Sequence, residues 1–306
     1  MKTNRSMKKG IFAVIIVIAA IYGISRSSSS SGDNVPSYRT EKSEARTADN
    51  ENYNSETAEA GADEMEAGGE EAEAPAGAAL ELPSTAAGPQ GKIIRHTGFT
   101  LSFNLKHNNP NWVAWELERS ETTGSLKRTD DFEPDTSLPR AHQVTTNDYR
   151  RSGYDRGHQV PAADMKWSPR AMADCFLMSN ICPQTHGLNA GPWSKLEAAC
   201  RRWANREGRV YIACGPIYRG SNQPSIGQRV RVTVPDAFFK VVLCMTKGKE
   251  KAIGFVYDNR DGKQDMSQAA MSVDEVEKIT GFDFFHNLPD ELEDRLEASC
   301  KFKYWQ

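Results

Sequence analysis

The sequence lacks a hydrophobic run as long as a typical transmembrane helix. Its longest, from Ile11 to Ile24, has about 14 residues, whereas a spanning helix needs about 20. No clean Ala-x-Ala cleavage site follows it, and no cysteine near its end could accept lipid. Basic residues precede the run at Lys2, Arg5, Lys8 and Lys9. We therefore expect residues 1–24 to be a signal peptide or a retained signal anchor, with the rest of the chain exported.

Between residues 25 and 90 the chain is nearly devoid of aliphatic residues. This stretch is Ser-rich and then rich in Glu, Ala and Gly, with 14 acidic against 4 basic residues. Such a composition cannot bury enough apolar surface to fold, so it predicts a disordered tether. Residues 91–306 contain 30 basic and 27 acidic residues. One mildly basic domain is expected there, which allows a polyanionic ligand.

Paired Cys-x-x-Cys motifs are also absent, which disfavours a structural zinc site. The chain has six cysteines, all in the region expected to fold: Cys175, Cys182, Cys200, Cys214, Cys244 and Cys300. An even number of cysteines in an exported protein suggests disulfide bonds, although six cysteines allow 15 pairings. The spacing does not choose among these pairings.

Neither internal repeats nor regular β-α alternation is present between residues 91 and 306. Val113, Trp115 and Leu117 alternate on one face of a strand expected over 112–118. A helix should begin near Pro192 and end before Gly208. Other strands are expected over 210–213, 230–234, 238–245 and 252–257, and other helices after Ser168, over 272–281 and after Pro289. This mixture predicts an α+β domain.

Three short segments, 154–158, 179–184 and 188–197, hold residues suited to phosphodiester hydrolysis. The neutral imidazole of His158 can take a proton from water near neutral pH. The amide oxygen of Asn189 suits a hard cation such as Mg²⁺. Glu197, two turns along the expected helix, can hold metal-bound waters. Taken singly, Asn189 could instead cap the helix, and Glu197 could pair with Arg201.

Arginines supply candidate phosphate contacts, because a guanidinium matches phosphate oxygens and keeps its charge. The leading candidates are Arg156, Arg201 and Arg128. Further arginines that could extend a basic groove along a polynucleotide are Arg140, Arg150, Arg151, Arg202, Arg206 and Arg209.

Together these segments resemble the DNA/RNA non-specific endonuclease family. These ββα-metal, or His-Me finger, nucleases include secreted sugar-non-specific nucleases and endonuclease G. The resemblance covers about Ile93 to Leu296. It includes blocks 109–114, 155–158, 179–197, 234–240 and 280–285. Several ordered blocks that match at once are more specific than the four residues Asp-Arg-Gly-His alone.

The resemblance implies an α+β fold in which helices flank a central, mostly antiparallel sheet, and two strands and a helix hold the site. By that resemblance His158 is the general base, and Asn189 is the protein ligand of one hydrated Mg²⁺ or Mn²⁺. Glu197 holds metal-bound water, and Asn180 orients its neighbours. The resemblance also places Arg156, Arg128 and Arg201 near the scissile phosphate.

We therefore expect a Mg²⁺-dependent endonuclease whose partners are DNA and RNA. Little sequence preference is expected, because its candidate contacts address phosphate rather than base edges. Two alternatives stay open: an exported protein that captures nucleic acid without cutting it, and a cysteine-zinc module in which His158 and Asn189 are incidental. An inhibitor protein is also left open.

The N-terminal segments lead to an expectation about location. An acidic tether differs from a mitochondrial targeting segment, which is rich in Arg and poor in acids. The expected location is the bacterial periplasm, the cell surface or the medium, with an anchor at residues 10–24 if the head is retained.

Overall fold

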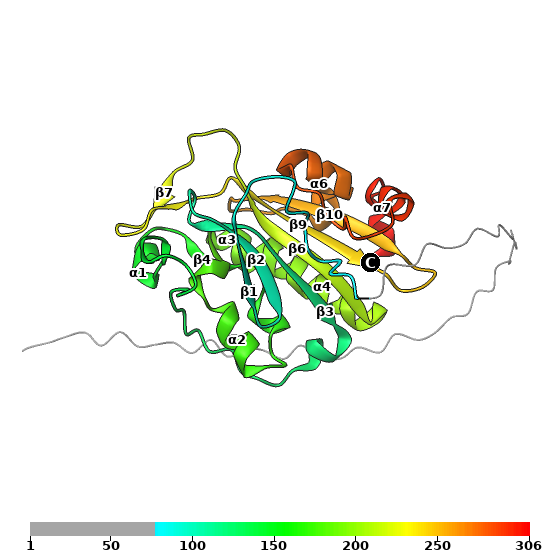
Figure 1. Ribbon diagram of the computed structural model, residues 1–306, viewed down its shortest axis with the longest axis horizontal. Helices are drawn as coiled ribbons and strands as arrows, with labels where there is room; N and C mark the ends of the chain where they lie inside the picture. The colour runs from blue at the N-terminus through cyan, green and yellow to red at the C-terminus, as the bar shows by residue number, and fades with distance from the viewer. Residues whose placement is uncertain (1–76) are drawn as a thin grey trace, which may run out of the picture. The chain divides into compact units, whose positions relative to one another are not determined.

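The computed structural model describes residues 77–306. The expected signal segment and the expected tether up to residue 76 lie outside the described residues. At the centre of the described region is a seven-stranded sheet in which all neighbouring strands are antiparallel (Figure 1). In spatial order its strands are β1 (Lys92–His96), β2 (Phe99–Asn104), β3 (Asn109–Glu118), β6 (Arg209–Ile217), β9 (Ala237–Cys244), β10 (Lys251–Asp258) and β11 (Ala270–Met271).

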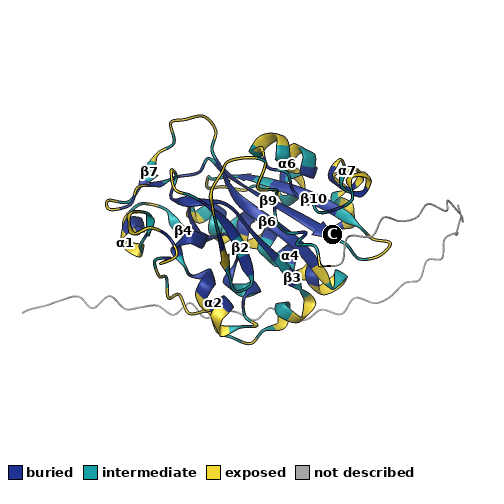
Figure 2. Cartoon of the chain, in the orientation of Figure 1, coloured by how far each residue is buried: buried dark blue, intermediate teal, exposed yellow. Residues whose placement is uncertain are grey.

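Both faces of this sheet are covered. Side chains of a strand alternate between the two faces, and in β3 Val113, Trp115 and Leu117 enter one hydrophobic core while Trp112 and Ala114 enter the other. The middle strands are therefore buried along nearly their whole length (Figure 2). The predicted alternation over 112–118 is confirmed, and the strand extends further toward the N-terminus than predicted.

The helices divide between the two faces. Helix α4 (Ser194–Glu207) contributes Leu196 and Trp203 to one core. Helices α6 (Val273–Thr280) and α7 (Asp290–Glu297) contribute Val276 and Leu292 to the other. Shorter helices are α1 (Thr146–Tyr149), α2 (Pro169–Cys175), α3 (His186–Leu188) and α5 (Met266–Ala269). The predicted α+β class is confirmed.

Local signals set most helix ends as predicted. Ser168 caps α2 by accepting a hydrogen bond from Ala171 N, and Ser272 forms a capping box with Glu275 at the start of α6. Helix α4 ends at Gly208, whose φ of 93° a residue with a Cβ rarely adopts. The start of α4 was predicted near Pro192. It lies at Ser194, because Gly191 interrupts the preceding π-helical turn over Asn189–Trp193 with φ −110° and ψ −109°.

Two small sheets lie outside the central one. One pairs β4 (Asp155–His158) with β5 (Ile181–Gln184), and the other pairs β7 (Ser225–Ile226) with β8 (Val232–Thr233). Strand β8 is shorter than the predicted 230–234, because this segment pairs only with another two-residue strand. None of the helices between residues 77 and 306 is long and apolar enough to span a bilayer.

The expected disulfides are not formed in this structure, where all six cysteines are free thiols. Five of them are buried, and Cys175, Cys182 and Cys200 belong to the core beneath α4. A free cysteine in such a place behaves as a small hydrophobic residue. An even number of cysteines suggests disulfide bonds, but the sequence does not say where the fold places each cysteine.

The core also begins earlier in the chain than expected. Residues 77–90 were assigned to the tether, yet Leu80 is only 2% exposed and packs in the core beneath α6 and α7. The amide of Ser84 donates a hydrogen bond to the carbonyl of Asp283. Two isolated leucines, Leu80 and Leu82, were too weak a sequence signal to reveal this packing.

Candidate active site

The β4–β5 hairpin positions the residues of the Asp-Arg-Gly-His motif. Strand β4 pairs antiparallel with β5, and Gly157 lies opposite Cys182. A Cβ on Gly157 would lie 2.2 Å from Oε1 of the buried Gln184, so only glycine fits at this position without a shift. The motif glycine is therefore needed for the strand pairing that presents its neighbours.

His158 is buried at the end of β4. Its side chain is wedged between two phenylalanines, with ring centroids 5.4 Å from Phe132 and 4.9 Å from Phe176. The residue is 7% exposed, and Nε2 has no hydrogen-bond partner among the described residues. Burial lowers its pKa to about 3, and the positive charges of Arg128 and Arg156 act in the same direction. The imidazole is therefore neutral at physiological pH, so one of its two ring nitrogens is unprotonated.

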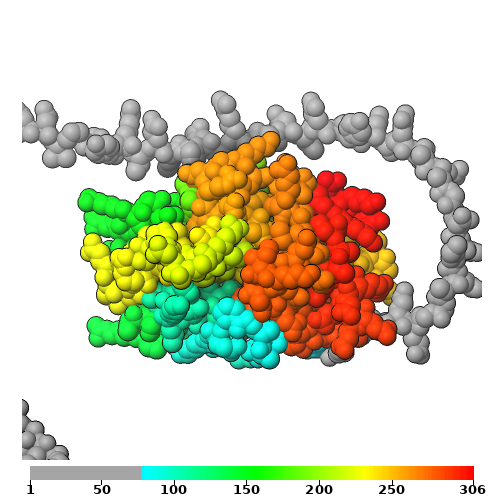
Figure 3. Space-filling view, turned by 90° about the horizontal axis from the view of Figure 1, so that it is seen from above, coloured from blue at the N-terminus to red at the C-terminus, as the bar shows by residue number. Residues whose placement is uncertain are grey.

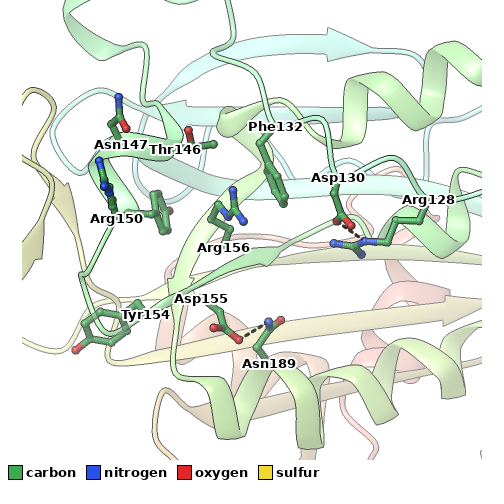
Figure 4. A pocket seen from close by; sticks show the side chains of 11 residues that line it. Arg128, Asp130, Phe132, Thr146, Asn147, Arg150, Tyr154, Asp155, Arg156 and Asn189 are labelled. Atoms are coloured by element: carbon green, nitrogen blue, oxygen red, sulfur yellow. Dashed lines mark hydrogen bonds and ion pairs between the residues drawn. The ribbon is translucent and has the colours of Figure 1, made fainter. Parts of the chain in front are cut away.

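Asn189 stands just before α4, at the first position of the π-helical turn. Its Nδ2 donates a hydrogen bond of 2.9 Å to Oδ2 of Asp155 (Figure 4). A carboxylate accepts but cannot donate, so it determines which end of the amide faces it. The same carboxylate oxygen is 2.9 Å from Nδ1 of His186. Asp155 thus leaves Oδ1 of Asn189 available to a cation.

A cavity of about 550 Å³ opens beside these residues. Of the predicted site residues, Arg128, Arg156 and Asn189 line it (Figure 4). The remaining lining residues are Asp130, Phe132, Thr146, Asn147, Tyr149, Arg150, Tyr154 and Asp155. His158 does not line the cavity, but its imidazole packs against Phe132, which does. The cavity is therefore mostly polar and carries several guanidinium groups.

The two lining arginines predicted for phosphate are held differently. The guanidinium carbon of Arg156 lies 4.2 Å from the centre of the Phe132 ring. Stacking uses the flat face of a guanidinium and leaves its in-plane N–H donors available. Arg128 pairs with Asp130 at 2.7 Å, with both side chains at least half exposed, and it also lies 5.1 Å from the Phe176 ring centre. An exposed ion pair of this kind is weak and easily exchanged for a phosphate contact.

Glu197 lies in the first turn of α4 and does not line the cavity. Burial raises its pKa to about 7, while the charge of Lys240 opposes that shift. Lys240 is fully buried, and its Nζ lies 4.7 Å from the ring of Trp115 and 4.6 Å from the ring of Trp193. Two indole faces thus stabilise an ammonium ion under the start of α4. Its charge favours the ionised form of Glu197.

Arg201 follows Glu197 by one helical turn. Its Nη1 forms an ion pair of 2.9 Å with Oδ1 of Asp164, a residue with no exposed surface. The other oxygen of Asp164 accepts a hydrogen bond from Trp115 Nε1 at 3.1 Å. Arg201 is 24% exposed and does not line the cavity. It is therefore anchored to the buried layer beneath α4.

Asn180, which was expected to orient its neighbours, does not line the cavity. Its Nδ2 donates to the carbonyls of Val160 and Cys175, and its Oδ1 accepts from the amide of Val160. All its polar atoms are engaged by backbone at 2.8 to 3.0 Å. This is the arrangement of a positioning residue, which ties the chain after β4 to the start of β5.

Sequence reasoning missed four residues that shape this region. Asp155 was treated only as part of the Asp-Arg-Gly-His motif and was given no role, although its carboxylate lies directly beside Arg156 in the sequence. Lys240 had a visible signal too, because it is one lysine within the otherwise apolar run Ala237–Cys244. Asp164 and Phe132 carried no comparable signal, since their partners lie in distant segments of the sequence.

The chain matches the family model for DNA/RNA non-specific endonucleases over residues 77–291. That match covers well over half of the sequence, so the chain belongs to this family. It is an enzyme of the nuclease class, and its fold is the ββα-metal nuclease fold. The two strands of the motif are β4 and β5, and the helix is α4.

Individual relatives agree with this assignment. A nuclease of Nostoc sp. is 32% identical over 227 residues, covering 70% of this chain and 80% of that protein. The mitochondrial nuclease 1 of Schizosaccharomyces pombe is 36% identical over 221 residues, covering 66% of this chain and 68% of that protein. A solved complex of EndoG with EndoGI, which addresses how EndoG is inhibited, matches with a TM-score of 0.63 and 26% identity, covering 67% of this chain and 89% of that one.

We predict that His158 stays neutral down to a pH of about 4. The folded pKa of about 3 lies below the ordinary 6.5, so between these values the unfolded chain binds a proton that the folded chain does not. Stability at this site is therefore lost as the pH falls through that window. NMR titration of the imidazole resonance, assigned with His158→Gln, measures the pKa directly. An inflection between pH 5 and 7 would show that the ring is not desolvated as described.

Proposed function

We propose that this protein is a Mg²⁺-dependent endonuclease that cuts DNA and RNA with little sequence preference. One observation carries the proposal. The amide oxygen of Asn189, oriented by Asp155, opens onto the same cavity as Arg156. A neutral histidine lies on the strand that supplies Asp155. A candidate cation ligand and a candidate phosphate-binding group thus line one cavity, and the candidate base packs against Phe132, another residue of its wall.

His158 is the proposed general base. Its depressed pKa keeps it unprotonated, so one of its ring nitrogens carries a free lone pair. A water molecule that donates to that nitrogen would lose its proton as it attacks phosphorus. Phe132 and Phe176 hold the ring in place and exclude competing hydrogen bonds. A positioned base of this kind contributes about 10² to 10⁴ in rate.

Asn189 is the proposed protein ligand of Mg²⁺, and Glu197 would hold one of the ion's waters. The donor set fits, because Mg²⁺ accepts neutral amide oxygens and carboxylates while retaining several waters. The bound ion would neutralise charge that develops on the phosphate and the departing oxygen. Burial raises the pKa of Glu197 to about 7, and the charge of Lys240 opposes that shift and so favours the ionised form, which accepts hydrogen bonds from water.

The arginines explain why both DNA and RNA are proposed as substrates. Arg156 and Arg150 line the cavity and can bind phosphate oxygens, which every nucleic acid carries. Arg206 and Arg209, which were considered for the same groove, are engaged elsewhere. Arg206 donates to the carbonyl of Gln306, and Arg209 pairs with Glu116 and Glu118. Phosphate contacts place the strand without reading base edges.

We also propose that the chain is exported, as a periplasmic, surface or secreted enzyme. The basic residues at the start of the sequence and the apolar run after them support this proposal. If the run is retained, it would make the membrane a second partner. Fractionation of cells that produce the full chain with a C-terminal tag checks this. Recovery of the chain only in the cytoplasm would contradict it.

The full chain should cut covalently closed circles of DNA and circular RNA in the presence of Mg²⁺, and EDTA should stop the reaction. Closed circles have no ends, so any cut is internal. Gel electrophoresis of nicked and linear products measures the rate. His158→Ala, purified identically, should be slower by about 10² to 10⁴ and should still bind nucleic acid. Shifted but uncut circles with the native chain would favour the capture alternative.

Asn189→Ala should raise the Mg²⁺ concentration required for half-maximal cleavage by at least about 10-fold, because it removes the amide ligand. Asp155→Asn should also raise it, by a smaller factor, because the amide of Asn189 loses its fixed orientation. Asn222→Ala, at an exposed loop position, is the matched control and should leave the requirement unchanged. An unchanged Mg²⁺ requirement in Asn189→Ala would remove the ligand assignment.

A further inference from the structure

A second group of carboxylates lies on the face of the sheet opposite α4, where α6 and α7 pack side by side (Figures 1 and 3). Asp274 and Glu277 are three residues apart on α6, and Glu297 is the last residue of α7. One carboxylate oxygen from each of the three lies within 4.8 Å of the others. The folded chain therefore brings three carboxyl groups from two helices to one point.

Glu297 is the most deeply buried member of this cluster. It is 4% exposed, and its Oε1 is buried with no hydrogen-bond partner among the described residues. Burial raises its pKa to about 10, and the neighbouring charges that add to this shift are Glu277, Glu293, Asp274 and Asp283. It also stands at the C-terminus of α7, where the helix dipole disfavours a negative charge. Without a cation this carboxyl group keeps its proton near neutral pH, and a bound cation would favour its ionised form.

The nearby basic residues do not fill this role. Lys278 lowers the pKa of Glu277, yet burial and two neighbouring acids outweigh it, and that pKa is raised to about 7. Glu277 does accept a hydrogen bond of 2.7 Å from the amide of Phe284, which fixes its position. Asp274 and Glu277 are partly exposed, so an ion from solvent can reach the cluster.

The three carboxyl groups suit a calcium ion. Calcium takes about six to eight oxygen ligands in a flexible geometry, and carboxylates are common among them. Mg²⁺ demands a near-ideal octahedron and is usually bound through one or two carboxylates. Oxygens of Asp274, Glu277 and Glu297 that lie within 4.8 Å of one another can surround one calcium ion, and water can complete its shell.

We propose that Asp274, Glu277 and Glu297 bind a Ca²⁺ ion that joins α6 to α7, at a site separate from the candidate active site. The ion supplies a positive charge beside Glu297 and links α6 to the end of α7. Both helices pack on the sheet through the core that contains Val276 and Leu292. Binding therefore stabilises the C-terminal part of the domain and takes no part in catalysis.

Calcium binding is best measured on the full chain carrying Asn189→Ala, which lacks the ligand proposed for the catalytic ion. Isothermal titration with CaCl₂ at pH 7.5 in 150 mM NaCl should show one ion per chain, with a Kd between about 1 µM and 1 mM. The melting temperature should rise by several degrees, and the rise should saturate with binding. Magnesium chloride should bind at least about 10-fold more weakly.

Glu297→Gln keeps the shape of the side chain and removes its charge, and it should abolish this binding step and the rise in melting temperature. Glu291→Gln is the matched control, because it removes one charge from an exposed position on the same helix. Circular dichroism checks that each variant folds. The native chain titrated beside Glu297→Gln gives the same comparison if Asn189→Ala does not fold.

Three results would overturn the proposal. The first is the absence of saturable calcium binding to a folded chain, and the second is equal weakening by Glu297→Gln and Glu291→Gln. The third is a melting temperature that rises on acidification from pH 8 to 6 but does not respond to calcium, which would mean that the carboxylates hold protons instead. None of these measurements uses nuclease activity, so the site and the proposed function can fail independently.

Discussion

The hydrogen bond from Asn189 to Asp155 joins the β4–β5 hairpin to the start of α4. It is the contact on which the candidate site depends, because it brings together elements that are 34 positions apart in the sequence and orients the amide oxygen of Asn189 toward the cavity. Gly157 permits the strand pairing that places Asp155 there, and Gly191 lets the chain turn from Asn189 into α4. The proposed cation ligand, Asn189, and the proposed base, His158, are therefore positioned by the same local structure.

Beneath this contact, a buried layer of charge fixes α4 on the sheet. Lys240 rises from β9 between two indole rings, and Asp164 holds both Arg201 and the indole nitrogen of Trp115. Removing one member of such a network leaves the others unpaired in the core, at a cost of about 3 to 5 kcal/mol. The start of α4 is therefore supported from inside the domain, while the cavity itself is lined by arginines that have partly exposed side chains or stack on Phe132.

Sequence reasoning succeeded where a local pattern dictates a local structure. The apolar stripe ending at Gly208 predicted α4, the Ser272–Glu275 box predicted α6, and alternation predicted β3. It could not locate β4 as a strand, because those four residues carry polar chemistry in place of an apolar alternation. The role of Lys240 and the unpaired state of the cysteines depend on how distant segments are placed, which no local pattern encodes.

The most direct test of the central claim is chemical rescue of the base. In His158→Gly the missing ring leaves a space between Phe132 and Phe176 into which imidazole can enter. The account predicts that this variant cleaves closed circular DNA about 10² to 10⁴ times more slowly than the native chain, and that added imidazole restores part of the rate in a Mg²⁺-dependent manner. Cleavage within a few-fold of the native rate without imidazole would contradict it.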